Sequence, residues 1–539
     1  MARTELLSSI EALQDLVGQQ QALLEAKDEE ITDQRTTIET QAEKIAYLEE
    51  WKRLIDSQRF GSKSEKAAPD QFPLFNEAEV EATGEAGEAE DDTVSVPAHT
   101  RKKRGGRSLP EFLPVREILH DLSDKEKVCP HDASHTMKEI GRESSDQLEF
   151  IPARVEVVRH VRPKYACPSC KEGVRIAPMP ALPVPKSIAT ASLLAQVVTS
   201  KYVDGLPLYR QEKIFDRLGL DLSRATLAHW MVKMGDLVEP LVDRIRQEIR
   251  AYDLAQCDET PFQVLKEPGK TAQSQSYLWA LRGGPQEHPL IYYEYDPSRS
   301  GEVPKRLLRG FEGFLQTDGY EGYTAIGREP GIVHVGCWAH ARRKFDEALR
   351  GQRSKSKKSS KKTTKESVAR QAMRQIQELY WIEKKLKDVS PEEKHRVRQE
   401  QSLPAVEKLR AWLTVSIDKV PPQSLTGKAM AYLDRQWPKL VRVFEDGRIP
   451  LDTNRVENVI RPFVVGRKNW LFADTTAGAR ASANLYGLIE TAKASGIEPW
   501  AYLRHVFDAL PRATSPEEIE ALLPQNVDPA LIRHPASRT

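Results

Sequence analysis

Five short apolar segments constrain the fold of this chain more than any other feature of its sequence. They are rich in Tyr, Val, Ile, Leu and Phe, are bounded by Gly or Pro, and comprise residues 252–258, 277–282, 290–295, 313–317 and 332–337. Runs of this length and composition are typical of β-strands. A helical segment, 304–309, separates the third from the fourth. Three consecutive strands, a crossover helix and further strands predict an α/β fold with a mixed sheet.

Helical patterns occupy most of the chain on either side of these strands. Residues 187–246 contain Gly-bearing turns and a segment for which Ser223 is the expected N-cap, and this combination suits a helix-turn-helix. Residues 340–440 are mostly helical. Because strand patterning does not resume there, we interpret them as an insertion. A last helical block covers 453–510, and a short helix is expected in the tail.

The N-terminal segment has the pattern of a coiled coil. Leu24, Ile31, Ile38 and Ile45 repeat every seven residues within a stretch that lacks Pro, which is the spacing of a coiled-coil seam. We expect this helix to pair protomers in a homo-oligomer. The alternative is an amphipathic helix docked on its own chain.

Composition excludes membrane and disulfide-rich classes of protein. Hydrophobic residues make up 39% and charged residues 29%, and no apolar run approaches the roughly 20 residues that span a bilayer. The N-terminus also lacks the apolar core of a signal peptide. Five cysteines in 539 residues do not make a disulfide framework, so a soluble protein in the reducing cytoplasm is expected.

The net charge of +1 hides separate acidic and basic runs. Residues 76–92 are acidic, whereas 101–107 and 353–365 are basic. Such runs are typical of disordered, solvated linkers, and basic runs also bind phosphate. Composition does not decide between these two roles.

A cysteine pair, Cys167 and Cys170, predicts a small metal-binding module. Tetrahedral Zn²⁺ needs four ligands, usually supplied as two close pairs. The second pair is irregular, because Asp132 stands where a Cys-x-x-Cys motif would have its second cysteine. We expect a structural Zn²⁺ held by Cys129, Asp132, Cys167 and Cys170, with His131 or His135 as alternatives for the fourth ligand. A metal-free remnant with buried thiols is the other interpretation.

Two aspartates stand at the ends of predicted strands. Asp258 follows the first strand and Asp318 follows the fourth. An ionised carboxylate at such a position is costly to desolvate unless a partner compensates. If the two strands are neighbours in the sheet, the carboxylates converge and form a site for Mg²⁺, which binds a few carboxylates and water.

Glu457 is the expected third acid. It lies near the start of a predicted helix that Asp452 or Thr453 can cap, and Arg461 follows one turn later on the same face. Two Mg²⁺ (or Mn²⁺) ions about 3.5–4 Å apart can activate a water or 3′-hydroxyl and stabilise the leaving oxygen of an in-line displacement. Spacing alone leaves three alternative acids open: Glu259, Asp452 and Glu490.

Basic residues accompany these acids. Because a DNA strand has to cross the carboxylates, we predict phosphate contacts for Arg342, Arg343, Arg455, Arg461, Arg467 and Lys468. Trp470 either stacks on a base or belongs to the core. The spacing of Cys337 and His340 is compatible with a metal or thiol site, and we favour a structural role near the carboxylates.

Longer motifs extend this interpretation. The segments RFGSKSEK, KYACPSC, KYVDGLPLYRQEKIF, CDETPFQVLKEPGK, TDGYEGY, GCWAHARRKFDEA, NRVENVIRPFVVGRKNWLFA and GIEPWAYL occur in this order. Over nearly its whole length the sequence resembles the IS66 family of bacterial insertion-sequence transposases. Many relatives look like Cys-Pro-x-Cys at the first zinc pair, whereas this chain departs from that pattern at Asp132.

The resemblance implies a DDE recombinase with an RNase H-like core that is interrupted by a helical insertion. Asp258, Asp318 and Glu457 fall in the family's acidic motifs. The implied activity is metal-dependent cleavage and strand transfer on double-stranded DNA, namely the element's terminal inverted repeats and a target. Small companion proteins encoded beside the transposase are also implied. A catalytically inactive relative that only occupies element ends is the alternative.

The expected organisation is multidomain α/β. In chain order we expect a coiled-coil helix (1–56), a charged linker (57–107), a zinc-finger-like β module (108–185), a helical DNA-binding region (186–247), the first part of the RNase H-like core (248–340), a helical insertion with a basic loop (341–440), the part of the core that carries the last acid (441–495) and a helical tail (496–539).

Overall fold

The computed structural model describes residues 2–60, 155–165, 175–356 and 366–532. The candidate zinc ligands lie outside these ranges, namely Cys129, His131, Asp132, His135, Cys167 and Cys170. The zinc site therefore stays a prediction, as do the roles of the charged runs at 76–92 and 101–107. On either side of Cys167 and Cys170, β1 (Lys164–Tyr165) and β2 (Arg175–Ile176) form a short antiparallel pair.

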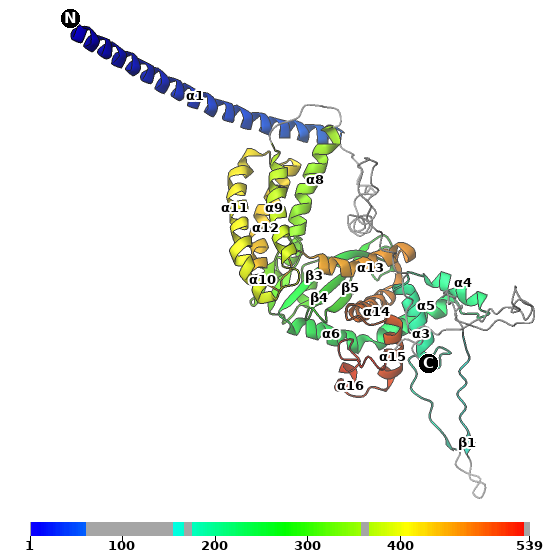
Figure 1. Ribbon diagram of the computed structural model, residues 1–539. Coiled ribbons are helices and arrows are strands. Elements are labelled where there is room, and N and C mark those ends of the chain that lie inside the picture. Colours follow the sequence, from blue (N-terminus) through cyan, green and yellow to red (C-terminus); the bar gives the residue numbers. More distant parts are fainter. Residues whose placement is uncertain (1, 61–154, 166–174, 357–365, 533–539) are drawn as a thin grey trace, which may run out of the picture.

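A mixed six-stranded sheet forms the centre of the chain (Figure 1). Its strands are β3 (Leu254–Lys266), β4 (Gln275–Gly283), β5 (Leu290–Asp296), β6 (Gly313–Gln316), β7 (Ile332–Val335) and β8 (Ala473–Thr475). The order is β5-β4-β3-β6-β7, and β8 pairs with the far end of β3. β4 is antiparallel to both β3 and β5, whereas β6 runs parallel to β3 and to β7. The prediction of a mixed sheet is confirmed.

Helices cover both faces of this sheet. α6 (Glu239–Ala251) and α7 (Glu302–Leu307) pack against the face that carries Tyr292 and Glu294, where Arg246 and Arg306 contact these side chains. α13 (Asn454–Trp470) and α14 (Thr476–Ala494) cover the opposite face. The main hydrophobic core lies between the layers and includes the fully buried Phe262, Trp279, Tyr293, Phe463 and Tyr486. Burial of each such side chain stabilises the fold by about 1.5–3 kcal/mol.

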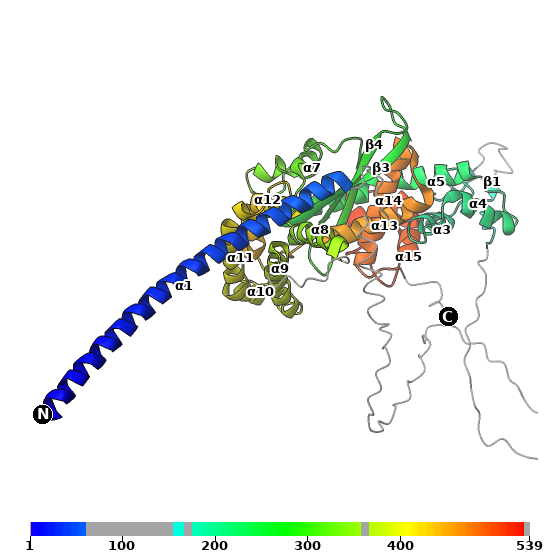
Figure 2. The same cartoon turned by 90° about the horizontal axis from the view of Figure 1, so that it is seen from above.

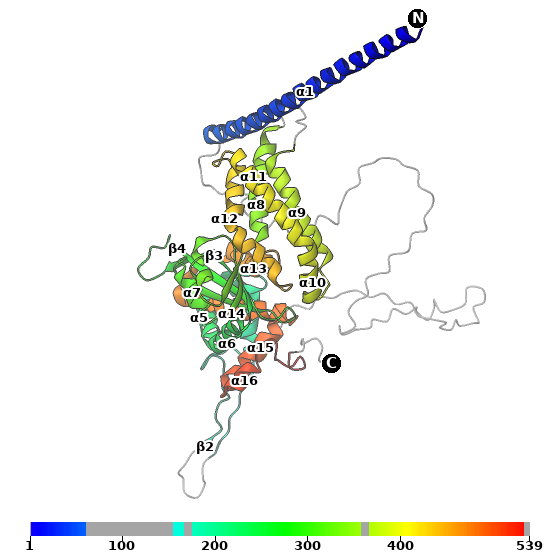
Figure 3. The same cartoon turned by 90° about the vertical axis from the view of Figure 1, so that its left-hand side faces the viewer.

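The segment between β7 and α13 folds into a second, helical core. It contains α8 (Trp338–Ser356), α9 (Val368–Lys385), α10 (Pro391–Val397), α11 (Leu403–Ser416) and α12 (Leu425–Leu440). These helices stand beside the sheet (Figure 3) and bury Trp338, Phe345, Leu409, Leu433 and Phe444 among themselves. The expected helical insertion is therefore present, and it returns to the sheet at α13.

A further helical region precedes the sheet and contacts the end of the chain. It comprises α3 (Ala191–Tyr202), α4 (Leu208–Arg217) and α5 (Arg224–Leu237), and it packs on α14 and on α15 (Pro499–Ala509), which α16 (Pro516–Glu520) follows. Ser223 caps α5 as predicted, because its side chain accepts from the Thr226 N–H at 3.2 Å. Gly235 permits the close approach of α5 to α14: a Cβ there would lie 2.4 Å from the Cα of Ala481.

Shorter helical turns complete the connections. They are the 3₁₀ segments η2 (Glu321–Tyr323), η3 (Ile326–Arg328), η5 (Ile417–Lys419), η6 (Val441–Glu445) and η7 (Leu510–Arg512), and the π-helical segment η4 (Arg398–Ser402).

The N-terminal helix α1 (Ala2–Phe60) projects away from the remainder of the molecule (Figure 2). Near its base, Glu43 forms an ion pair with Lys419 at 2.5 Å. The seam residues Leu24, Ile31, Ile38 and Ile45 are each at least 45% exposed. The predicted helix is confirmed, and its seam is exposed rather than docked on the part of the chain that the structure describes. Pairing of this seam between protomers stays a prediction.

Two details differ from the sequence-based expectation. Asp258 does not end its strand, because β3 continues to Lys266 and contains Pro261. The last block, expected to be helical throughout, includes β8. Within the described ranges, no helix has the length and apolar character that crossing a membrane requires.

Candidate active site

Asp258 and Asp318 occupy equivalent positions on neighbouring strands. In the parallel pair β3–β6, Gln256 is opposite Gln316, and each aspartate follows its glutamine by two residues. β6 ends at Gln316, so β3 has no parallel neighbour beyond Gln256 until β8 pairs with Val264. Side chains alternate along a strand, which places Asp258 on the same face as Gln256. Both aspartates are partly exposed where the sheet divides.

A buried glutamine pair holds these two strands together. Gln256 Nε2 donates to Gln316 Oε1 at 2.7 Å and to the carbonyl of Asp452 at 3.2 Å. Gln316 Nε2 in turn donates to the carbonyls of Gly336 and Pro450 at 3.2 and 2.8 Å. The pair therefore joins β3, β6, the end of β7 and the segment that leads into α13. We did not predict this network, although the repeated Gln-x-Asp spacing in the two strands was a signal for it.

Other acids surround the Asp258 carboxyl group. Burial raises the pKa of Asp258 well above its usual value, and the charges of Glu259, Asp318 and Glu457 raise it further. The N–H of Glu259 donates to Asp258 Oδ1 at 2.8 Å and opposes this shift. Asp318 Oδ1 accepts from the N–H of Tyr320 at 2.9 Å. The charges of both Asp318 and Glu457 thus act on the Asp258 carboxyl group, but among the described residues the group whose ligand atoms lie within 4.8 Å of one another is Cys337, His340 and Glu457.

Glu457 reaches this site from the first turn of α13. Thr453 Oγ1 donates to Glu457 Oε1 at 2.9 Å, and the Glu457 side chain is 9% exposed. Asp452 Oδ1 accepts from the N–H of Asn454 at 3.2 Å. Of the two capping residues expected, Asp452 therefore contacts the start of the helix, whereas the Thr453 side chain orients Glu457.

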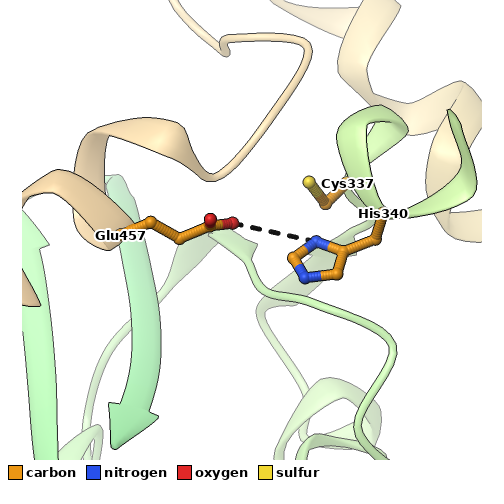
Figure 4. A group of neighbouring side chains, drawn as sticks. All are labelled: Cys337, His340 and Glu457. Atoms are coloured by element: carbon orange, nitrogen blue, oxygen red, sulfur yellow. Dashed lines mark ion pairs between the residues drawn. The ribbon is translucent and has the colours of Figure 1, made fainter. Parts of the chain in front are cut away.

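Residues that precede and begin α8 form the other side of this site (Figure 4). Glu457 and His340 point toward one another, with His340 Nδ1 3.8 Å from Glu457 Oε1, and Arg343 Nη2 lies 3.6 Å from Oε2. Cys337 Sγ lies 3.2 Å from Thr453 Oγ1 and accepts from its N–H at 3.3 Å. The ligand atoms of Cys337, His340 and Glu457 all lie within 4.8 Å of one another.

The Cys337 thiol positions the start of α13. Burial raises the pKa of Cys337 to about 12, so the thiol is protonated at neutral pH. Thr453 Oγ1 contacts both Cys337 Sγ and Glu457 Oε1. A hydroxyl has one proton to donate, and the carboxylate is the stronger acceptor. The structural role favoured for Cys337 fits these contacts.

The alternative acids have other partners. Glu259 points to the opposite face of the sheet, where it accepts from Arg299 Nε at 2.8 Å and from the hydroxyl of Tyr323. Glu490 forms an ion pair with Lys493 at 2.9 Å on α14. Asp452 accepts the helix-start N–H described above. Glu259 and Glu490 thus have ion-pair partners of their own and Asp452 contacts the start of α13, whereas the assignment of Asp258, Asp318 and Glu457 as the metal-binding acids stays a prediction.

The predicted DNA-contacting cations have different environments. Arg343 is beside Glu457, and Arg342 lies 5.3 Å from the ring of Tyr380. Burial lowers the pKa of both Arg455 and Arg467. Arg461 has a buried Nε without a hydrogen-bond partner among the described residues, and Lys468 is exposed. Of these six cations, Arg343 forms an ion pair with one of the three acids, Glu457, and the DNA contacts of all six stay predictions.

Trp470 is part of the hydrophobic core. Its ring makes edge contacts with Phe262 at 5.8 Å and with Phe463 at 5.4 Å. Lys201 lies over the same ring at 5.7 Å. Of the two roles weighed for Trp470, these contacts support packing rather than base stacking.

Comparison with known families identifies the chain. Residues 186–481, more than half of its length, match the model of the family described as "Transposase IS66 family". The chain belongs to the IS66 transposase family. Three further matches agree: "zinc-finger binding domain of transposase IS66" over 126–171, "IS66 C-terminal element" over 487–525 and "Transposase C of IS166 homeodomain" over 47–118. The three expected acids, Asp258, Asp318 and Glu457, lie within the first match. Membership of the IS66 family indicates a transposase-type nuclease or recombinase that binds DNA.

Similar proteins from Sinorhizobium fredii extend over nearly the same length. "Uncharacterized protein y4jD" is 32% identical and covers 91% of this chain and 95% of its own. "Uncharacterized protein y4qI" is 31% identical over 95% of this chain and 94% of its own. "Uncharacterized protein y4hP" is 29% identical and covers 83% of this chain and 82% of its own. These relatives show that the similarity extends over most of the chain, and their names give no activity.

Proposed function

We propose that this IS66 protein is a DDE-type transposase that binds the ends of its element and performs metal-dependent cleavage and strand transfer on DNA. The proposal is supported by the proximity of Asp258 on β3 to Asp318 after β6 and to Glu457 on α13, whose charges both act on the Asp258 carboxyl group. These acids come from sequence positions far apart, and the fold alone gives no reason for three carboxyl groups to gather there.

The architecture supports an RNase H-like catalytic core. Three antiparallel strands are followed by a helix and two strands parallel to β3, and a helical insertion precedes the helix that supplies the last acid. This is the arrangement that the IS66 resemblance implied. The insertion therefore separates Asp318 from Glu457 in sequence while α13 restores their proximity.

The donor set suits a hard divalent cation. The two aspartates are partly exposed and Glu457 is buried, and together the three carboxylates offer the oxygen ligands that Mg²⁺ or Mn²⁺ prefers. Burial is the main cause of the raised pKa of Asp258, and the neighbouring like charges, which a bound cation would compensate, raise it further. When bound, two such ions activate the attacking water or 3′-hydroxyl and stabilise the leaving oxygen. Asp258, Asp318 and Glu457 would hold these ions.

The chain's own residues organise the site. The bond between Gln256 and Gln316 keeps the two aspartate-bearing strands in register. Thr453 orients the Glu457 carboxylate, and Arg343 partly balances its charge. Arg299 keeps Glu259 on the other face, so that a fourth carboxylate does not enter the site.

Other parts of the chain supply assembly and DNA recognition. We propose a structural Zn²⁺ in the zinc-finger segment, a helix-turn-helix built by α4 and α5, and self-association through α1. Double-stranded DNA, as terminal repeats and target, is the proposed substrate. Companion proteins of the element remain part of this proposal through the family resemblance alone.

Substitution of the three acids tests this function. We expect Asp258→Asn, Asp318→Asn and Glu457→Gln each to abolish cleavage and strand transfer, because each removes a charged ligand while retaining side-chain size. The assay uses full-length protein, Mg²⁺ and labelled DNA that carries the element ends. Binding of these ends, measured by gel shift, should be largely unchanged.

Asp474→Asn is the matched control. Asp474 is a surface residue that pairs with Lys266 outside the site, so its substitution should leave joining at the wild-type level. Retained joining by any one of the three acid variants would contradict the assignment of that acid. If the wild-type protein binds the element ends but does not cleave DNA, the result would instead support the alternative hypothesis of a catalytically inactive relative that only occupies these ends.

A further inference from the structure

Helix α12 has one buried face and one polar face. Met430, Leu433 and Leu440 are fully buried in the second core. Tyr432, Arg435 and Lys439 have the spacing i, i+3 and i+7, which places them together on another face of the helix. None of these three residues belongs to the set for which sequence predicted DNA contacts.

This polar face lies beside the carboxylates. The N–H of Gly336, at the end of β7, donates to the carbonyl of Lys439 at 3.0 Å. At Gly319, which follows Asp318 directly, a Cβ would lie 2.4 Å from the hydroxyl oxygen of Tyr432. The Tyr432 hydroxyl therefore rests against the backbone of the Asp318 segment, and any side chain at position 319 would displace it.

The surrounding charges confirm how close α12 is to the acids. Burial lowers the pKa of Lys439, Asp318 opposes that shift, and Arg435 and Arg328 add to it. Burial raises the pKa of Tyr432, and so do Cys337 and Asp318, whereas Arg435 and Arg343 oppose the rise. Tyr432 is thus a neutral hydrogen-bond donor at neutral pH, located between the groups that surround Asp318 and those that surround Glu457.

Among the described residues, the cations on this side form no close ion pair, although the charge of Asp318 acts on Lys439. Throughout the portion of the chain that the structure describes, Arg328, Arg435 and Lys439 form no ion pair, although Arg435 lies 5.9 Å from the ring of Tyr432. The acid on the same helix, Asp434, is directed to α11, where it pairs with Arg410 at 2.6 Å. Positive charges that lie close together without ion-pair partners repel one another, and a bound anion relieves this repulsion.

We propose that Tyr432, Arg435 and Lys439 of α12 bind the phosphodiester backbone of the DNA strand that crosses the carboxylate site. The proposal rests on the transposase function and adds a second DNA-contacting wall, supplied by the helical insertion opposite α13. Guanidinium, ammonium and hydroxyl groups all donate to phosphate oxygens and do not read bases. The face therefore holds DNA of any sequence at the point where a bond is to be broken.

Charge removal from this face provides the test. The double variant Arg435→Gln/Lys439→Gln keeps polar side chains of similar reach and removes two positive charges. Binding of a fluorescein-labelled, random-sequence DNA duplex is followed by anisotropy over a range of salt concentrations, with full-length protein in Mg²⁺. Asp258→Asn is present in every protein compared, so that no DNA is cut during the titration.

Two lost phosphate contacts have a defined signature. We expect weaker binding and a salt dependence, as the slope of log K against log salt, that is shallower by about 2. Arg410→Gln is the matched control, because Arg410 lies in the same helical core and is already paired with Asp434. Its slope should equal that of the parent. An unchanged slope and affinity in the double variant would overturn the proposal.

The hydroxyl contact is tested separately by Tyr432→Phe in the otherwise wild-type protein. Loss of one donor to a reacting phosphate lowers the cleavage rate by about 10²-fold, whereas DNA affinity changes little. Tyr502→Phe, which also removes a buried hydroxyl donor but far along the chain on α15, is the control. A cleavage rate of Tyr432→Phe equal to that of the wild type would show that the Tyr432 hydroxyl does not contact the phosphate. Because binding is measured without cleavage, failure of the DDE chemistry and failure of this face give different results.

Discussion

At the residue scale, the site depends on side chains that hold other side chains. Thr453 orients Glu457, and the glutamine pair keeps Asp258 and Asp318 in register. A third support is His334 on β7, whose Nε2 lies 2.8 Å from Thr317 Oγ1, next to Asp318. Spacing alone left Glu259, Asp452 and Glu490 open beside Asp258, Asp318 and Glu457, and the family resemblance selected the last three; sequence patterns suggested acids at strand ends and helix starts, although Asp258 lies within β3. They did not predict the supports, which depend on contacts between strands.

His334 gives a prediction for stability against pH. Burial lowers the pKa of His334 to about 3, from an unfolded value near 6.5. Between about pH 6.5 and pH 3, the imidazole of His334 binds a proton in the unfolded chain but not in the native state. The contribution of His334 to the free energy of unfolding is therefore fully present above about pH 6.5 and is lost as the pH decreases toward 3. Because carboxylates titrate in the same range, the quantity to compare is the difference between wild type and His334→Asn.

Thermal unfolding measured from pH 7 to pH 4 checks this expectation. The Tm of the wild type should fall more steeply than that of His334→Asn, since only the wild type loses the contribution of a neutral, buried imidazole. Parallel curves for the two proteins would show that His334 is not held neutral in the folded state.

At the element scale, the sequence predicted which segments form strands and helices better than where they end. β3 continues past Asp258 because Phe262 and Val264 are apolar and bury against α13, and Pro261 interrupts no bond that the pairing needs. β8 was missed because its three residues are stable only beside β3. Ser223 was predicted correctly because an N-cap depends on adjacent residues alone.

Helix α1 gives a prediction about assembly. An exposed apolar seam on a long helix is stabilised when a second copy covers it. We expect deletion of residues 1–56 to lower the oligomeric state. The double substitution Ile31→Asp/Ile38→Asp should have the same effect without shortening the chain, because it places charge in the seam.

Light scattering on the full-length and altered proteins measures this directly. Glu25→Gln/Glu29→Gln, on exposed positions outside the seam, serves as the control and should retain the wild-type mass. An unchanged mass in the deletion variant would refute pairing through α1.

At the scale of the whole molecule, two hydrophobic cores meet at the sheet edge where β6 and β7 end. Contacts across this junction include Gln316 with Pro450, Gly336 with Lys439 and Cys337 with Thr453. The helical insertion is therefore joined to the catalytic sheet beside the acids rather than at a distance. Sequence patterns predicted an insertion from the interrupted strand pattern, but the surface that it turns toward the acids depends on packing between the two cores.

The central claim is that Asp258, Asp318 and Glu457 together hold divalent metal. The most direct measurement is anomalous diffraction from crystals of the full-length protein grown with Mn²⁺. We expect anomalous density in contact with oxygen atoms of all three acids, and its loss in Asp258→Asn. Density confined to Cys337 and His340, or no density at the three acids, would contradict it.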